Sequence, residues 1–207
     1  YDFNSNPAYQ LNNGDVTVTK TLTTNGGNWM ALANPYTFKL DVATFLADQA
    51  ACMEDQFQGK VIYKFDGTQF TPVITGVINV TEGFFVNFNH NGTHSATFQK
   101  NQRLTTSAKA STQREFVRLA MLDGEREVEV LFAQNEQANE EYDIFDANKL
   151  FSPSEITEPY FVVNNIELVK EEVNTLPYYA TMNVRSYGNK EVTFKANYIP
   201  EGLAVSI

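Results

Sequence analysis

The chain has 207 residues, a formal net charge of −10 at pH 7 and a pI of about 4.6. This length allows one large domain or two small ones, and either can bury a core of useful size. The acidic balance disfavours nucleic acid and anionic membranes as partners, because both are negatively charged. No apolar run is long enough to span a bilayer and no signal peptide is recognisable, so we expect no membrane insertion by this segment.

The cysteine and aromatic content also narrows the possibilities. The single cysteine, Cys52, cannot form an internal disulfide, and its apolar surroundings favour a small buried residue over a nucleophile. Aromatic residues make up 13% of the chain, and such bulky groups can fill the space between two sheets. The chain begins at Tyr1 and ends at Ile207 within strand-like patterns, so we expect it to be a piece of a longer protein.

The first regular pattern follows a polar, Asn-rich segment. Val16, Val18 and Leu22 alternate with threonines, and this period of two in β-branched residues predicts a half-buried strand. Asn25-Gly26-Gly27 predicts a turn into the next strand.

The second predicted strand covers residues 29–33 and ends at a corner. Proline at 35 lacks an N–H and forces Asn34 into an extended conformation. The small residues Ala31 and Ala33 share a face with Trp29, which leaves room for a large ring. We therefore predict that Trp29 is buried between sheets, that both faces of the strand are covered, and that Asn34 bonds local backbone groups.

One short helix is predicted near residues 41–51. Asp41 is a suitable N-cap residue. The residues that then recur at helical spacing are Val42, Phe45, Leu46 and Gln49.

Two further hairpins are predicted in the first half. Asp66-Gly67 is a strong hairpin signal, and with that loop Tyr63 faces Phe70. A strand over 84–88 then precedes Asn91-Gly92 and a second strand. Hydrophobic matching of these two strands sets Val86 against Phe98 and Phe88 against Ala96.

The second half begins after a connection of almost no apolar content at 99–114. A hairpin with Gly124-Glu125 as its loop pairs Met121 with Val128, Leu119 with Val130 and Val117 with Phe132. An acidic loop covers 135–141, and further strands are expected at 161–168, 180–184, 192–198 and 203–207.

These elements predict an all-β fold. We expect an antiparallel β-sandwich of jelly-roll or Ig-like type, in two tandem units, with the one helix near 41–51. The units are expected at 1–103 and 114–207, incomplete at the N-terminus and the C-terminus respectively, with a linker at about 104–113. A single continuous sandwich is the alternative.

Residues that might carry chemistry do not converge on a site. His90 and His94 could meet, but a metal site needs a third ligand and a second shell, which favours solvated loop histidines. An acidic set offers oxygens to calcium without the spacing of a calcium loop, so calcium binding by 135–146 stays open. This set consists of Glu140, Glu141, Asp143 and Asp146.

Aromatic side chains offer a second kind of site. Exposed aromatic rings can stack on sugars, but Trp29, Tyr63 and Phe70 are more readily explained as core residues. No local pattern supports the paired carboxylates of a glycosidase, and no hydrolase or phosphate-binding motif is present. We predict no catalytic residue, no metal and no cofactor, and the ligand-binding residues are unknown at this point.

The order of several short motifs resembles a known family. Gly27-Asn28-Trp29 followed by Asn34-Pro35-Tyr36 is similar to an element of large secreted surface proteins of Bacteroidota, which often carry a type IX secretion sorting domain at the C-terminus. Later motifs agree in order, although Ala33 stands where the family usually has Gly. They are Ile62-Tyr63-Lys64-Phe65-Asp66-Gly67-Thr68, Glu82-Gly83-Phe84-Phe85-Val86, Phe116-Val117-Arg118-Leu119, Tyr142-Asp143 with Lys149-Leu150-Phe151, and Asn174-Thr175-Leu176-Pro177.

The resemblance covers nearly the whole chain and implies an extracellular or outer-surface β-sandwich region beside other modules. It carries over no catalytic residue. We expect a non-enzymatic structural or adhesive segment whose partners are neighbouring modules or other surface proteins. The alternatives are a carbohydrate-binding module, which needs solvent-facing aromatics in one plane or groove, and a hydrolase, which needs a cleft with two carboxylates.

Overall fold

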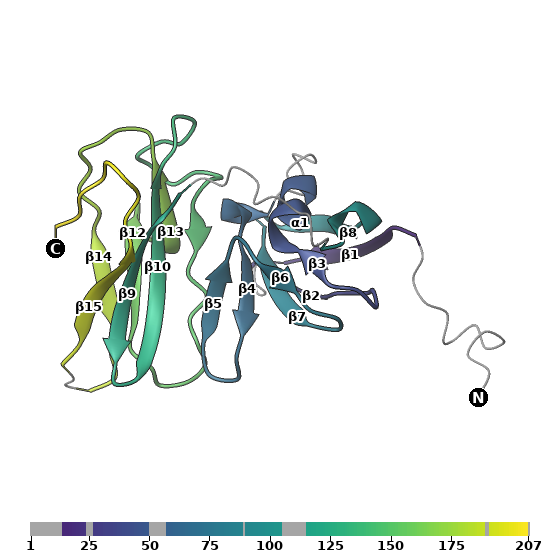
Figure 1. Ribbon diagram of the computed structural model, residues 1–207, viewed down its shortest axis with the longest axis horizontal. Helices are drawn as coiled ribbons and strands as arrows, with labels where there is room; N and C mark the ends of the chain where they lie inside the picture. The colour runs from purple at the N-terminus through teal and green to yellow at the C-terminus, as the bar shows by residue number, and fades with distance from the viewer. Residues whose placement is uncertain are drawn as a thin grey trace. The chain divides into compact units, whose positions relative to one another are not determined.

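The computed structural model describes residues 14–23, 27–49, 57–88, 90–104, 115–188 and 191–206. Strands account for 48% of the structure and helices for 8%, so the described part of the chain is mostly β with one α-helix, as predicted (Figure 1). Among the described residues, no helix has the length and apolar character needed to cross a membrane.

The chain divides into two compact units. The first takes residues from 1–57 and 73–111, and the second takes residues from 58–72 and 112–207. This division differs from the expected boundaries, because it assigns residues 58–72 to the second unit. Most of the expected linker, residues 105–113, lies outside the described residues, as do Cys52 and the end of the predicted helix.

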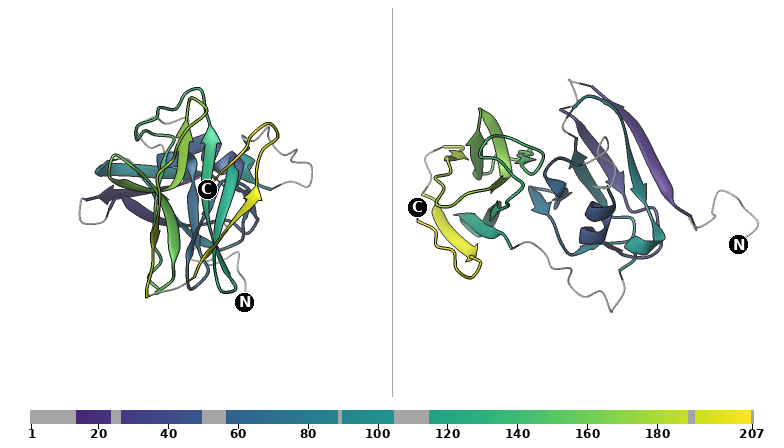
Figure 2. Two further views of the ribbon diagram at one scale, coloured as in Figure 1. Left: turned by 90° about the vertical axis from the view of Figure 1, so that its left-hand side faces the viewer. Right: turned by 90° about the horizontal axis from the view of Figure 1, so that it is seen from above.

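The first unit contains three antiparallel strand pairs and the helix. The pairs are β1–β8, β2–β7 and β3–β6. Figure 2 shows β1 lying along β8. The elements are β1 (Val16–Leu22), β2 (Trp29–Ala33), β3 (Leu40–Asp41), α1 (Val42–Gln49), β6 (Val77–Ile78), β7 (Gly83–Asn87), β8 (Gly92–Phe98) and η5 (Lys100–Gln102).

The helix and its core confirm the sequence pattern. The Asp41 carboxylate accepts a hydrogen bond from the Thr44 N–H at 2.8 Å, which caps α1. The four residues predicted to face inward are buried. Phe45 lies among aromatic rings, with its centroid 5.1 Å from that of Phe98 and 5.5 Å from that of Phe84.

The prediction for Trp29 was wrong, although β2 has the predicted bounds. Met30 and Leu32 are the buried residues, Trp29 is half-buried, and the alanines on its face are exposed. The register explains the outcome, because Met30 faces Val86 and Leu32 faces Phe84, so the larger apolar set lies on that side.

The prediction for Asn34 is confirmed. Its amide nitrogen donates to the carbonyl oxygens of Phe38 at 2.8 Å and Asn79 at 3.0 Å. Its side-chain oxygen accepts from the Tyr36 N–H at 3.0 Å. These bonds fix the chain around Pro35.

The predicted pairing of β7 with β8 was also wrong. β8 pairs with β1, which sets Val16 against Phe98 and Val18 against Ala96. On the opposite face the hydroxyl groups of three cross-strand pairs hydrogen-bond at 2.8–3.0 Å. These pairs are Thr17–Thr97, Thr19–Ser95 and Thr21–Thr93, so both faces of β8 match β1.

The second unit is built on one large sheet, and its strands β4 and β5 are neighbours in a separate sheet. The strand order of the large sheet is β14-β12-β13-β10-β9-β15, and β11 pairs with β13 beside this path. β10 and β13 run parallel, and the other pairs in the sheet are antiparallel. The elements are η4 (Gln58–Lys60), β4 (Ile62–Phe65), β5 (Phe70–Val73), β9 (Val117–Asp123), β10 (Arg126–Gln134), β11 (Ala147–Asn148), β12 (Glu158–Val163), β13 (Ile166–Val173), β14 (Met182–Arg185) and β15 (Thr193–Tyr198).

The β9–β10 hairpin has the predicted register at all three apolar pairs. The strand predicted over 161–168 is divided into the end of β12 and the start of β13 by a turn, where Asn164 and Asn165 both take positive φ, at 51° and 64°. Asparagine tolerates this conformation better than most residues, which permits so tight a turn. Residues 203–206 form no strand, contrary to prediction.

The β4–β5 hairpin turns one residue later than predicted. The Asp66 N–H donates to the Gln69 carbonyl, which leaves Gly67 and Thr68 as the loop. The Phe65 ring therefore lies 4.7 Å from that of Phe70, and the pairing predicted for Tyr63 was wrong. Hydrogen bonds from the backbone of Gln69 and Thr68 lower the pKa of Asp66 and hold this loop.

Candidate functional site

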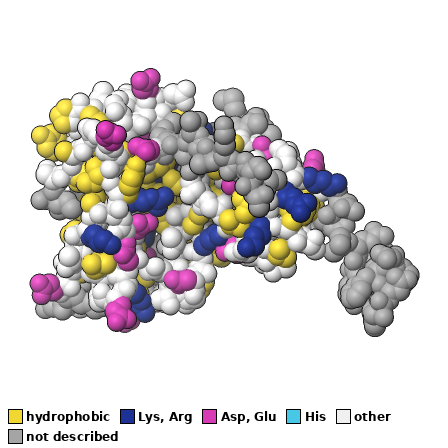
Figure 3. All heavy atoms as spheres, in the orientation of Figure 1, with side chains coloured by type: hydrophobic (Ala, Val, Ile, Leu, Met, Phe, Trp, Pro, Cys, Tyr) yellow, Lys and Arg dark blue, Asp and Glu magenta, His cyan; other side chains and the backbone are white. Residues whose placement is uncertain are grey.

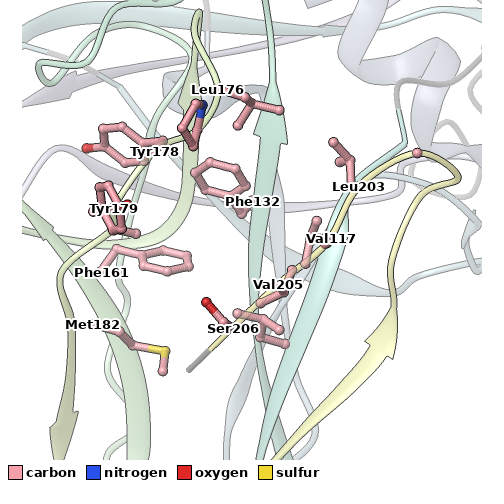
Figure 4. Close-up of a pocket in the computed structure, with 15 residues that line it drawn as sticks. Val117, Phe132, Phe161, Leu176, Tyr178, Tyr179, Met182, Leu203, Val205 and Ser206 are labelled. Carbon is pink, nitrogen blue, oxygen red and sulfur yellow. The ribbon is translucent and has the colours of Figure 1, made fainter.

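The second unit contains an open, mostly apolar groove of about 780 Å³ (Figure 4). This volume lies in the range of small-ligand sites in proteins. Hydrophobic side chains are interspersed with charged ones on the surface of this unit (Figure 3). The groove is lined by Val117, Leu119, Phe132, Phe161, Leu176, Pro177, Tyr178, Tyr179, Ala180, Met182, Gly202, Leu203, Ala204, Val205 and Ser206.

Three strands supply the floor of the groove. β9 and β10 contribute Val117 and Phe132, which are direct cross-strand partners. β12 contributes Phe161, whose ring centroid lies 6.4 Å from that of Phe132 in an edge-to-face arrangement. The alternation that buries one face of the β9–β10 hairpin thus also builds the floor.

Two segments outside the long strands form the walls. One wall contains Tyr178 and Tyr179, and the other contains Leu203 and Val205, on the opposite side of the floor (Figure 4). The Tyr178 ring stacks on Phe132 at a centroid distance of 6.0 Å. Tyr179 is 91% exposed, so its ring is available to a partner without any rearrangement.

A buried carboxyl group lies behind the tyrosine wall. Glu171 is 1% exposed and is the cross-strand partner of Phe132. Burial raises the pKa of Glu171 to about 7, with the nearby Tyr178 hydroxyl acting in the opposite direction. The pKa of Tyr178 is raised in turn, first by burial and then by Glu171. A substantial fraction of Glu171 is therefore neutral near pH 7.

An ionic network supports the strands that carry the groove. Glu158 accepts from Arg185 at 2.6 Å and pairs with Lys149 at 3.1 Å. Its carboxylate also accepts from the hydroxyl and N–H of Ser152. Arg185 lies 4.3 Å above the centre of the Phe151 ring. Because Glu158 is on β12 and Arg185 on β14, the network holds together the strands of Phe161 and Met182.

The composition of the groove determines which chemistry it offers. The only side-chain polar atoms in its lining are the hydroxyls of Tyr178, Tyr179 and Ser206. The lining therefore contains neither paired carboxylates nor a nucleophile with an adjacent base. The groove favours a partner with apolar surface, because binding removes that surface from water and this removal is favourable.

The residues considered as metal ligands do not form a cluster, and the expectation of a solvated loop histidine was wrong for His94, which lies in β8 and is 1% exposed. His94 Nε2 lies 3.0 Å from the His90 carbonyl oxygen, and the two rings are 4.6 Å apart. Within the described ranges no group of three or more His, Cys, Asp or Glu is placed to hold a metal ion. In the acidic loop, Asp143 accepts from the Asn139 N–H at 2.8 Å, and Asp146 accepts from the Asp143 N–H at 3.0 Å and the Glu172 N–H at 3.0 Å.

None of the predicted aromatic candidates lines the groove. Tyr63 is 1% exposed and donates to the Asn148 carbonyl, so its assignment to the core is confirmed. Phe70 and Trp29 are half-buried and do not line the groove. No sequence pattern indicated the groove. The available signal was the apolar run Leu176-Pro177-Tyr178-Tyr179, which falls outside any predicted strand.

Comparison with family models, curated proteins and solved structures finds no match to this chain. The resemblance to Bacteroidota surface proteins therefore stays a prediction.

Proposed function

We propose that this chain is a non-enzymatic adhesive segment of a secreted or cell-surface bacterial protein, and that the groove of its second unit contacts an extended segment of a protein partner. The observation that carries the proposal is the groove lining, in which twelve of the fifteen residues have no side-chain hydroxyl or charge. A partner with apolar side chains gains free energy there by leaving water.

The same composition argues against the alternative, a carbohydrate-binding module. Sugars present many hydroxyl groups, and a site that buries them without hydrogen-bond partners loses binding free energy. One observation favours sugars nevertheless, since Tyr179 presents an open ring of the kind that stacks on a pyranose. The two functions are therefore tested side by side.

Two further expectations belong to this proposal. A sandwich architecture in two units is the arrangement we propose for the described strands, which pair antiparallel except for the parallel pair β10–β13. The proposed extracellular location is supported by the order of the sequence motifs at residues 27–36, 62–68, 82–86 and 174–177. This location is tested by antibody labelling of intact cells of the organism that makes the protein. Labelling that occurs only after the cells are lysed contradicts an extracellular location.

The binding test screens a displayed peptide library and a glycan array in parallel, followed by titration calorimetry of the selected compounds. Tyr179→Ser is the diagnostic variant, because the 91% exposed side chain contributes little to folding. A tyrosine can bury on the order of 150 Å², or roughly 4 kcal/mol before the costs of association. We expect peptides with apolar side chains to bind and the variant to weaken them at least tenfold, about 1.4 kcal/mol.

Tyr198→Ser is the matched control, because Tyr198 is 42% exposed and does not line the groove. Peptide binding that survives Tyr179→Ser contradicts the groove as contact site. Glycan binding that Tyr179→Ser abolishes, with no peptide selected, replaces the proposal with the carbohydrate-binding alternative.

A further inference from the structure

A second cluster in the same unit joins an amine, an amide and a carboxylate. Lys170, Glu172 and Asn135 are 2%, 3% and 4% exposed. Lys170 Nζ contacts Glu172 Oε1, and Asn135 Nδ2 donates to Glu172 Oε2 at 2.9 Å. One buried carboxylate therefore touches the lysine amine with one oxygen and the asparagine amide with the other.

The backbone fixes this arrangement. β10 and β13 run parallel, with Ala133 opposite Glu172 and Gln134 opposite Val173. Asn135 follows directly, and its N–H donates to the Val173 carbonyl at 2.7 Å. The two neighbouring strands therefore hold the lysine and the asparagine on either side of one carboxylate.

The asparagine amide is also polarised. Its Oδ1 accepts a hydrogen bond from the Gln137 N–H at 3.1 Å. A donor in this position stabilises negative charge on the oxygen when a nucleophile adds to Cγ. The lysine nitrogen lies 5.4 Å from the centre of the Phe116 ring, so an aromatic group borders the amine.

We propose that Lys170 and Asn135 form an intramolecular amide cross-link, with Glu172 as the proton-transfer group. The Lys170 amine transfers a proton to Glu172, and the neutral Nζ attacks Cγ of Asn135. The resulting oxyanion is held by the Gln137 N–H. Glu172 then gives its proton to Asn135 Nδ2 and takes the remaining extra proton from the attacking Nζ. The Cγ–Nδ2 bond breaks, ammonia leaves and Glu172 remains as the neutral acid. One C–N bond forms, one breaks, and no oxidant or cofactor is needed.

Burial favours the start of this reaction. Removing water disfavours the charged pair relative to neutral amine and neutral acid, which is the form the attack requires. It also keeps water from competing with the amine for Cγ. A fully paired Lys–Glu–Asn network without reaction is the alternative explanation of the same geometry.

Intact-mass spectrometry of the purified chain decides between them. We expect a mass below the sequence value by one molecule of ammonia. Because trypsin does not cleave after an acylated lysine, digestion should join residues 127–149 to an uncut 150–185. Loss of ammonia by cyclisation at an Asn-Gly sequence gives no such joined peptide. A wild-type digest in which 150–170 is released as a free peptide overturns the proposal.

Variants then test the roles. Asn135→Asp should cross-link with loss of water instead of ammonia, while Lys170→Arg should retain the full sequence mass. Glu172→Gln keeps the shape of the side chain and removes the proton acceptor, so it should also retain the full mass. A cross-linked Glu172→Gln chain overturns the role of Glu172. The joined peptide of the wild type stands as evidence for the cross-link even where a variant fails to fold.

Discussion

Replacing Glu158 by glutamine should destabilise the second unit strongly, because the change leaves two cations without their shared anion. Lys149 is 1% exposed at its side chain, so it cannot reach water, and burial already lowers its pKa. Arg185 is 28% exposed and can turn partly toward solvent. Breaking a buried ion pair by removing one partner costs about 3–5 kcal/mol of folding free energy. Because Arg185 can turn toward solvent, we expect a loss of stability near the lower end, about 3 kcal/mol.

Urea denaturation followed by far-ultraviolet circular dichroism measures this loss. The single tryptophan, Trp29, belongs to the first unit, so its fluorescence is not a local probe of the second. Glu127→Gln is the matched control, because Glu127 and Lys195 are 37% and 52% exposed at 3.5 Å. Such a pair contributes less than about 1 kcal/mol. If Glu158→Gln costs no more than this control, the argument from charge burial is refuted.

Two other outcomes are expected of the second unit. Burial raises the pKa of Glu171 to about 7 and that of Asp146 to about 6, so their contribution to stability is full below about pH 4 and is lost as the pH rises through 7. The urea concentration at the unfolding midpoint should therefore be lower at pH 8 than at pH 5. If the Glu171→Gln variant shows the same decrease as the wild type, the role of Glu171 is contradicted. Gly59→Ala places a Cβ 2.4 Å from that of Ala147, whereas Gly124→Ala, at a similar positive φ, meets nothing within 4 Å. Thermal melts should show a loss for Gly59→Ala larger by about 1–3 kcal/mol, and equal losses contradict the steric argument.

The elements that the sequence predicted correctly are those whose pattern is local. The β9–β10 hairpin follows from apolar residues at period two on both sides of one short loop. Helix α1 follows from a capping aspartate and four residues at helical spacing. Both patterns lie within 20 residues, so no distant partner was needed to interpret them.

Several of the predictions that were wrong concern residues whose structural neighbours are distant in the sequence. β8 carries apolar residues on one face that match either β7 or β1, and only the threonines of β1 complete the match on the other face. The small residues beside Trp29 predicted that its ring faces the core. Instead, Met30 and Leu32 face the core, because they pair with large apolar residues of β7. The groove was missed because its walls come from 176–182 and 202–206, which no sequence period links.

The assignment of residues 58–72 to the second unit bears on how this chain can be divided or recombined. Gln58 donates to the carbonyls of Asp143 and Asp146, and Tyr63 donates to that of Asn148, all within the second unit. A gene fusion or exon-like exchange that cuts in the 104–113 region therefore transfers the second unit without one of its own pieces. The two halves of the sequence are therefore not independently exchangeable parts.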